Sequence, residues 1–109
     1  MTHYFAVRIR MNAAGEPERL QVRVLRTPLD ELGERQATAL GPEQDLHASD
    51  VANLIAAGDR VYAAFRDERL GSWIAGDELC AVSGRTFETV ETRDVEGRTT
   101  GDHTRLARY

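Results

Sequence analysis

Apolar and polar residues alternate at the start of the chain with the two-residue period of half-buried β-strands. The period runs through residues 3–10 and, after a turn-rich stretch at 12–18, resumes at 20–24. The apolar residues of both segments are expected to share one buried face: Phe5, Val7, Ile9, Leu20, Val22 and Val24. The pattern predicts an antiparallel hairpin with a long loop.

The pattern changes to a helical one between residues 48 and 57, where apolar residues recur at the spacing of an amphipathic helix. Ser49, or His47 just before it, is suited to cap the first turn. Gly58 supplies the left-handed residue that commonly ends a helix. A third strand is predicted directly afterwards, at 61–65, where apolar residues alternate again.

Two more strands are predicted around Ser83 and Gly84, because two apolar runs separated by two turn-forming residues are typical of a hairpin. With this turn, Cys80 would face Phe87 across the ladder. From about residue 91 the chain is rich in charges and poor in apolar residues. This region is expected to be a polar tail with at most one short element.

The expected order is strand, strand, helix, strand, strand, strand, in a single domain that spans residues 1–109. It predicts an α+β fold, a mostly antiparallel sheet of about five strands with one helix packed on it. Residues 26–46 interrupt the order and are expected to form an irregular insertion. Thr27 and Pro28 are suited to start a short helix within it.

Four segments carry a resemblance to a known family: YFAVRIRMNAAGEPERLQVRV, DVANLIAAGDRVYAAF, GSWIAGDELCAVSGRTFETV and DHTRL. In these segments the chain resembles a small family, domain of unknown function 3892, which is found in short prokaryotic proteins. A bacterial origin is therefore expected. The family has a strand pair, a helix ending in Gly, a strand, a Trp-containing loop and a hairpin. Its closing Asp-Asn-Leu segment differs here, because His103 follows Asp102. The resemblance implies an order of elements and no activity.

Composition narrows the classes of function. The net charge is −4, and broad nucleic-acid binding depends on an excess of positive charge. All 14 basic residues are arginine, which fits either a GC-rich genome or selection for bidentate binding of phosphate or carboxylate. The single Cys cannot form an internal disulfide. No apolar run approaches the roughly 20 residues of a membrane span. A cytoplasmic protein without membrane association is expected.

No catalytic constellation is evident, and we expect no cofactor and no metal site. Gly71 and Gly76 have the spacing of a phosphate loop, but Asp77 and Glu78 replace its Lys and Ser or Thr. The three His are scattered without metal-ligand spacing. Cys80, in the middle of a predicted strand, is expected to be a buried, inert thiol.

The outer face of the first predicted hairpin is the candidate binding surface. It carries the arginines Arg8, Arg10, Arg19 and Arg23. Such like charges on paired strands repel unless an anion lies among them. The anion could be one of the chain's own acids, from the 26–46 segment (Asp30, Glu31 and Glu34) or from the tail, or it could be an external nucleic acid or acidic protein. Tyr4, at the edge of this face, could add stacking.

Trp73 lies between two glycines and has two interpretations. It could cover the open side of the core, or it could be an exposed ring that stacks on a base or grips a peptide. The function that the sequence favours is a non-catalytic binding or interaction module with an arginine-rich hairpin face. The alternative is a homo-oligomer or partner-pairing protein that uses an unpaired sheet edge, and a small enzyme is the least favoured.

Overall fold

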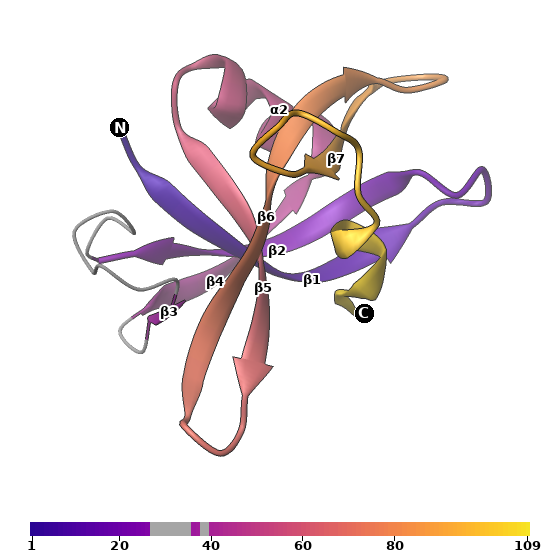
Figure 1. Cartoon of the computed structure of the whole chain (residues 1–109). Helices are drawn as coiled ribbons and strands as arrows, with labels where there is room; N and C mark the ends of the chain where they lie inside the picture. The colour runs from indigo at the N-terminus through magenta and orange to yellow at the C-terminus, as the bar shows by residue number, and fades with distance from the viewer. Residues whose placement is uncertain (27–35, 38–39) are drawn as a thin grey trace.

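The computed structural model describes residues 1–26, 36–37 and 40–109. This part of the chain has one α-helix, one 3-10 helix and eight strands in a single sheet (Figure 1). The strands are β1 (His3–Met11), β2 (Pro17–Leu25), β3 (Gln36–Ala37), β4 (Leu40–His47), β5 (Arg60–Asp67), β6 (Ser72–Ser83), β7 (Glu88–Arg93) and β8 (Ala107–Arg108). The helices are α2 (Ala48–Ala56) and η1 (Asp102–Arg105).

The sheet confirms the α+β class and corrects the predicted order. Its strands lie in the order β3-β6-β5-β1-β2-β4, with β7 paired to β6 and β8 paired to β1. β1 is parallel to β5 and β8, and the other pairs are antiparallel. The predicted number of about five strands and their order along the chain are wrong. The prediction lacked β3 and β4, which precede α2, and β8, which follows η1.

The segment expected to be an irregular insertion ends in a regular strand, β4, which pairs antiparallel with β2. Residues 42–45 of β4 are exposed on the edge of the sheet and are polar apart from Pro42. An edge strand of this kind lacks the alternation from which strands are predicted. The short helix predicted from Thr27 falls mainly on residues outside the described part of the chain.

A β-bulge in β1 corrects the predicted inner face of the first hairpin. The register with β2 shifts between Ala6 and Arg8, which leaves Val7 as the extra residue. Ile9 belongs to the main core, whereas Phe5 and Val7 belong to a second buried cluster. The prediction that all three share one face is wrong, because strict alternation does not allow for a bulge.

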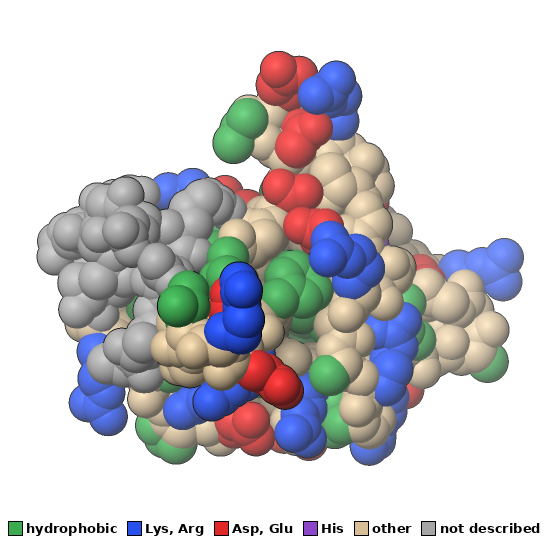
Figure 2. All heavy atoms as spheres, turned by 60° about the horizontal axis from the view of Figure 1, so that its bottom comes forward, with side chains coloured by type: hydrophobic (Ala, Val, Ile, Leu, Met, Phe, Trp, Pro, Cys, Tyr) green, Lys and Arg blue, Asp and Glu red, His purple; other side chains and the backbone are tan. Residues whose placement is uncertain are grey.

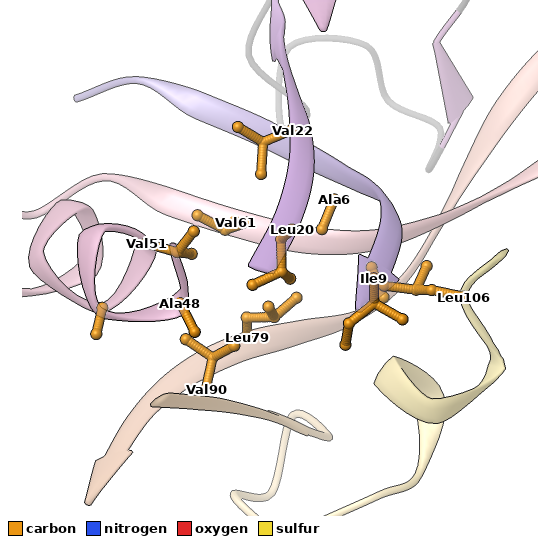
Figure 3. Close-up of a cluster of buried hydrophobic side chains, with 12 residues drawn as sticks. Ala6, Ile9, Leu20, Val22, Ala48, Val51, Val61, Leu79, Val90 and Leu106 are labelled. Carbon is orange, nitrogen blue, oxygen red and sulfur yellow. The ribbon is translucent and has the colours of Figure 1, made fainter. Parts of the chain in front are cut away.

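The main core lies between α2 and one face of the sheet (Figure 3). Its buried residues are Ala6, Ile9, Leu20, Val22, Ala48, Val51, Ala52, Val61, Ala63, Leu79, Val90 and Leu106. They come from β1, β2, α2, β5, β6, β7 and the residue after η1. The core therefore joins the beginning of the chain to its last described segment.

The predicted helix is confirmed, and its ends have the predicted chemistry. His47 is the N-cap, and its Nδ1 accepts a hydrogen bond from the Ser49 backbone N–H at 3.1 Å. This bond satisfies one of the N–H groups that a first helical turn leaves unpaired. Gly58 has a φ of 102°, a left-handed conformation that favours glycine. The chain can therefore turn directly from α2 into β5.

The β6–β7 hairpin was predicted in the right region with the wrong turn. Its loop is residues 84–87, closed by the Gly84 N–H, which donates to the Phe87 carbonyl at 3.0 Å. Cys80 therefore pairs with Glu91 instead of Phe87. The Phe87 ring lies edge-on to the His47 ring, with 4.7 Å between centroids. This contact with the start of α2 is tertiary, and turn propensity does not detect it.

The region predicted as a polar tail is largely structured. β7 extends to Arg93, and Leu106 is buried in the main core with 3% exposure. β8 then pairs with Arg8 and Ile9 of β1. Residues 102–109, which we call the returning segment, therefore lie across the sheet from β7 to β1, as Figure 1 shows.

Candidate functional site

Four arginines lie on one face of β1 and β2, as strand alternation predicted. We call them the arginine patch: Arg8, Arg10, Arg19 and Arg23. Arg10 pairs with Arg19 across the ladder, and Arg8 pairs with Gln21. Directly opposite residues of an antiparallel pair project to the same side. The patch therefore lies on the face opposite Leu20 and the main core.

Arg19 has an acidic partner within the chain. Its Nε donates to Asp45 Oδ1 at 3.0 Å, and the Tyr109 hydroxyl donates to the same oxygen at 2.8 Å. The Tyr109 hydroxyl and the Arg19 guanidinium hold the pKa of Asp45 below its ordinary value, although burial opposes them. Burial, together with the hydrogen bond to Asp45, raises the pKa of Tyr109 to about 12. Asp45 is therefore an ionised acceptor between two donors at neutral pH.

Arg10 contacts Tyr109 as well. The Arg10 Nε donates to the Tyr109 backbone oxygen at 3.1 Å. The Arg10 guanidinium carbon also lies 5.0 Å from the centroid of the Tyr109 ring, in the range of a cation–π contact. One tyrosine thus contacts the patch through its backbone oxygen, its ring and, through Asp45, its hydroxyl.

Arg8 is the member of the patch whose side chain has no polar partner among the described residues. Arg23 donates from Nε to the Gly41 carbonyl at 2.7 Å, whereas Arg8 is exposed. Opposite Arg8, Gln21 Oε1 is buried and accepts no hydrogen bond within residues 1–26, 36–37 and 40–109. A buried acceptor left without a donor costs about 1–3 kcal/mol. An available donor and an unsatisfied acceptor therefore lie in adjacent strands.

Tyr4 and Trp73, the aromatic candidates from the sequence, do not join the patch. Tyr4 packs against the main core, on the face opposite the arginines, because the bulge at Val7 reverses the alternation between Tyr4 and Arg8. Trp73 lies within β6 instead of a loop, and its half-buried ring packs against the second buried cluster. The Arg66 guanidinium lies 5.9 Å from the Trp73 ring centroid.

The acid that holds the patch, Asp45, lies in the 26–46 segment predicted to supply it, but it is not one of the three acids named there. Asp30, Glu31 and Glu34 lie outside the described residues. Asp45 supplies the carboxylate, and the tail contributes Tyr109, whose hydroxyl donates to Asp45, in place of the predicted acid. The hydrophobic pattern did not single out Asp45, because the strand that carries it does not alternate.

A hollow of about 340 Å³ opens between β5, β6 and the end of β7. Its lining residues are Arg60, Tyr62, Ala75, Gly76, Asp77, Glu78, Arg93, Asp94 and Val95. Arg60 donates twice to Glu78, at 2.8 and 3.0 Å, and Arg93 donates to Glu91 at 2.8 Å. The lining contains neither His nor a nucleophilic Cys or Ser. Its charges mainly hold one another, and it offers no pairing of nucleophile and base.

Cys80 was predicted to be a buried, inert thiol, and it is instead partly exposed. Burial, together with the nearby Glu78 and Glu91 carboxylates, raises the pKa of its thiol. A thiol of this kind is protonated at neutral pH and is a poor nucleophile. Within the described part of the chain, no group of His, Cys, Asp and Glu side chains is arranged to hold a metal ion.

Comparison with known proteins found no relative. No family model, no curated protein and no solved structure matches the chain. The resemblance to domain of unknown function 3892 therefore stays a prediction. No described helix is long and apolar enough to cross a membrane.

Proposed function

We propose that the protein is a non-catalytic binding module whose arginine patch recognises an acidic segment of another protein. The proposal rests on Arg8, whose side chain has no polar partner among the described residues, and on Gln21, whose buried Oε1 accepts no hydrogen bond there. A side-chain carboxylate accepts two hydrogen bonds from one guanidinium in a planar arrangement. A peptide also carries backbone N–H donors, which suit the Gln21 carbonyl once that carbonyl is uncovered. An extended acidic peptide therefore complements both groups.

A nucleic acid suits the patch less well. Glu43 and Asp45 lie in the neighbouring strand, opposite Arg23 and Gln21. These carboxylates repel any anionic ligand, but phosphate groups offer acceptors only and cannot satisfy Gln21 Oε1, whereas a peptide also supplies backbone N–H donors. Figure 2 shows blue basic and red acidic side chains on the face turned to the viewer.

Binding of a fluorescent oligoglutamate peptide tests the proposal. The wild type should bind it, with an affinity that falls as salt is added. Arg8→Ala should weaken binding about tenfold, the size expected for a lost charge-assisted hydrogen bond. The matched control is Arg69→Ala, an exposed arginine in the β5–β6 turn, which should leave affinity unchanged.

Absence of peptide binding, or equal affinity of the wild type and Arg8→Ala, overturns the proposal. A single-stranded RNA probe is the second arm of the experiment. If it binds more tightly than oligoglutamate and depends on Arg8, the partner is a nucleic acid instead.

A second candidate is self-association through β4, because this strand has a described strand partner, β2, on one edge only. Antiparallel pairing of two copies centred on Gln44 would place Glu43 of one copy opposite Asp45 of the other. Directly opposed like charges destabilise a strand pair. We therefore expect sedimentation velocity to give a monomer at all concentrations, and a concentration-dependent dimer would favour this second candidate.

A further inference from the structure

Tyr109 lies across the arginine patch. Its backbone oxygen accepts from Arg10 of β1, and its hydroxyl donates to Asp45 of β4. Because β2 lies between these two strands, Tyr109 spans β2. The residues of β2 at this level are Arg19, opposite Arg10, and Gln21, opposite Asp45. Tyr109 therefore crosses β2 at the level of Arg19 and Gln21.

The contacts that hold Tyr109 are exposed. In the pair beneath it, the Arg19 and Asp45 side chains are 35% and 49% exposed. Exposed ion pairs and hydrogen bonds are individually weak because water competes for them. The buried Leu106, three residues earlier, holds the returning segment in place independently of them. Tyr109 can therefore leave the patch without unfolding the chain behind it.

We propose that Tyr109 is an autoinhibitory occupant of the arginine patch, which an acidic ligand must displace to reach Arg10 and Gln21. The inference rests on the proposed function, because it concerns regulation of the same surface. With Tyr109 in place, Arg8 is the exposed guanidinium that makes first contact. When Tyr109 leaves, Arg10 becomes available and the Gln21 carbonyl is uncovered.

The groups that Tyr109 presents define what a competing ligand must offer. Its backbone oxygen accepts one hydrogen bond from Arg10, whereas a ligand side-chain carboxylate can accept two from one guanidinium. Its hydroxyl satisfies Asp45, which a ligand carboxylate would repel. The best ligand is therefore an acidic segment with a hydroxyl side chain where it passes Asp45.

With Tyr109 as a competing occupant, the measured affinity equals the affinity of the open form multiplied by the fraction of molecules in which the patch is open. If the patch is open in about one molecule in ten, binding is about tenfold weaker than to the open form. Removing the tyrosine recovers that factor. Its size therefore reports how firmly Tyr109 is held.

The test measures oligoglutamate affinity for the wild type, Tyr109→Ala and Tyr109→Phe. Tyr109→Ala should bind about tenfold more tightly. Tyr109→Phe keeps the ring on Arg10 and loses the bond to Asp45, so its affinity should lie between the other two. It also keeps the inference testable if the alanine variant does not fold. The matched control, Tyr4→Phe, alters a tyrosine on the opposite face and should bind as the wild type does.

The outcomes separate this inference from the proposed function. If Arg8→Ala weakens binding while both Tyr109 variants bind like the wild type, the inference is overturned and the proposed function stands. Weaker binding by Tyr109→Ala also overturns it, because the tyrosine would then be part of the binding site. If neither the wild type nor any variant binds, both proposals fall.

Discussion

The two ends of the returning segment are held in different ways. At one end, His103 Nδ1 lies 3.2 Å from the Thr92 backbone N–H and 2.9 Å from its hydroxyl oxygen, and Thr92 is fully buried. Leu106 follows and enters the main core. At the other end, Tyr109 meets exposed arginine and aspartate side chains. Burial therefore makes the first end part of the fold, and exposure leaves the second able to exchange partners.

The largest expected effect comes from the buried end. Leu106→Ala removes a side chain that is 3% exposed and should lower the free energy of unfolding by about 2–5 kcal/mol. Urea denaturation measures this change. The control is Leu70→Ala, at a leucine that is 63% exposed, and should change stability by less than about 0.5 kcal/mol. Equal losses in both variants would show that Leu106 is not an anchor.

Removal of the Thr92 hydroxyl should have the next largest effect on stability. It accepts from the His103 backbone N–H and the Thr100 hydroxyl, both at 3.1 Å. Thr92→Val keeps the shape of the side chain but leaves these two donors without their acceptor. The free energy of unfolding, measured by urea denaturation, should fall by about 1–3 kcal/mol. Thr99→Val, at an exposed threonine of the same region, is the comparison and should be nearly neutral. A neutral Thr92→Val would mean that the hydroxyl does not hold the segment.

Acid should lower the stability of the protein through His103, at the buried end of the returning segment. Burial lowers the pKa of His103, assisted by the Arg108 charge and opposed by the Glu91 and Asp102 carboxylates. Below the ordinary His pKa of 6.5, the unfolded chain binds more protons at this residue than the folded chain does. Stability should therefore fall as pH drops through 6.5, until the lowered pKa of the folded state is passed.

His103→Asn removes the titrating group while keeping an acceptor near the position of Nδ1. The decrease in the free energy of unfolding from about pH 7.5 to pH 5.5 should be smaller in this variant than in the wild type. Identical pH dependence of the two proteins would exclude His103 as a source of the acid sensitivity.

The exposed end should give the smallest change in stability and a clear spectroscopic signal. The pKa of Tyr109 is raised to about 12, so its tyrosinate absorbance should appear only at the end of an alkaline titration. Tyr109→Phe should remove that last component and leave the fold intact. If the lost component titrates at the ordinary tyrosine pKa, about 10, then Tyr109 does not donate to Asp45.

Local pattern was enough to predict α2, the first hairpin and the shared face of the four arginines. It could not place Tyr4, because one bulged residue at Val7 moves Tyr4 to the opposite face. It also could not find the partners of the patch. Asp45 lies in an edge strand without alternation, and Tyr109 is 64 residues away from it in the chain. Only the tertiary fold brings the two together.

Nuclear Overhauser contacts between the Tyr109 ring and the Arg10 side chain are the most direct test of autoinhibition by Tyr109. They should be present in the ligand-free protein, where the ring centroid is 5.0 Å from the guanidinium carbon. Saturation with oligoglutamate should abolish them while the Leu106 contacts with the core persist. Peptide bound at Arg8 with the Tyr109–Arg10 contacts intact would contradict autoinhibition by Tyr109.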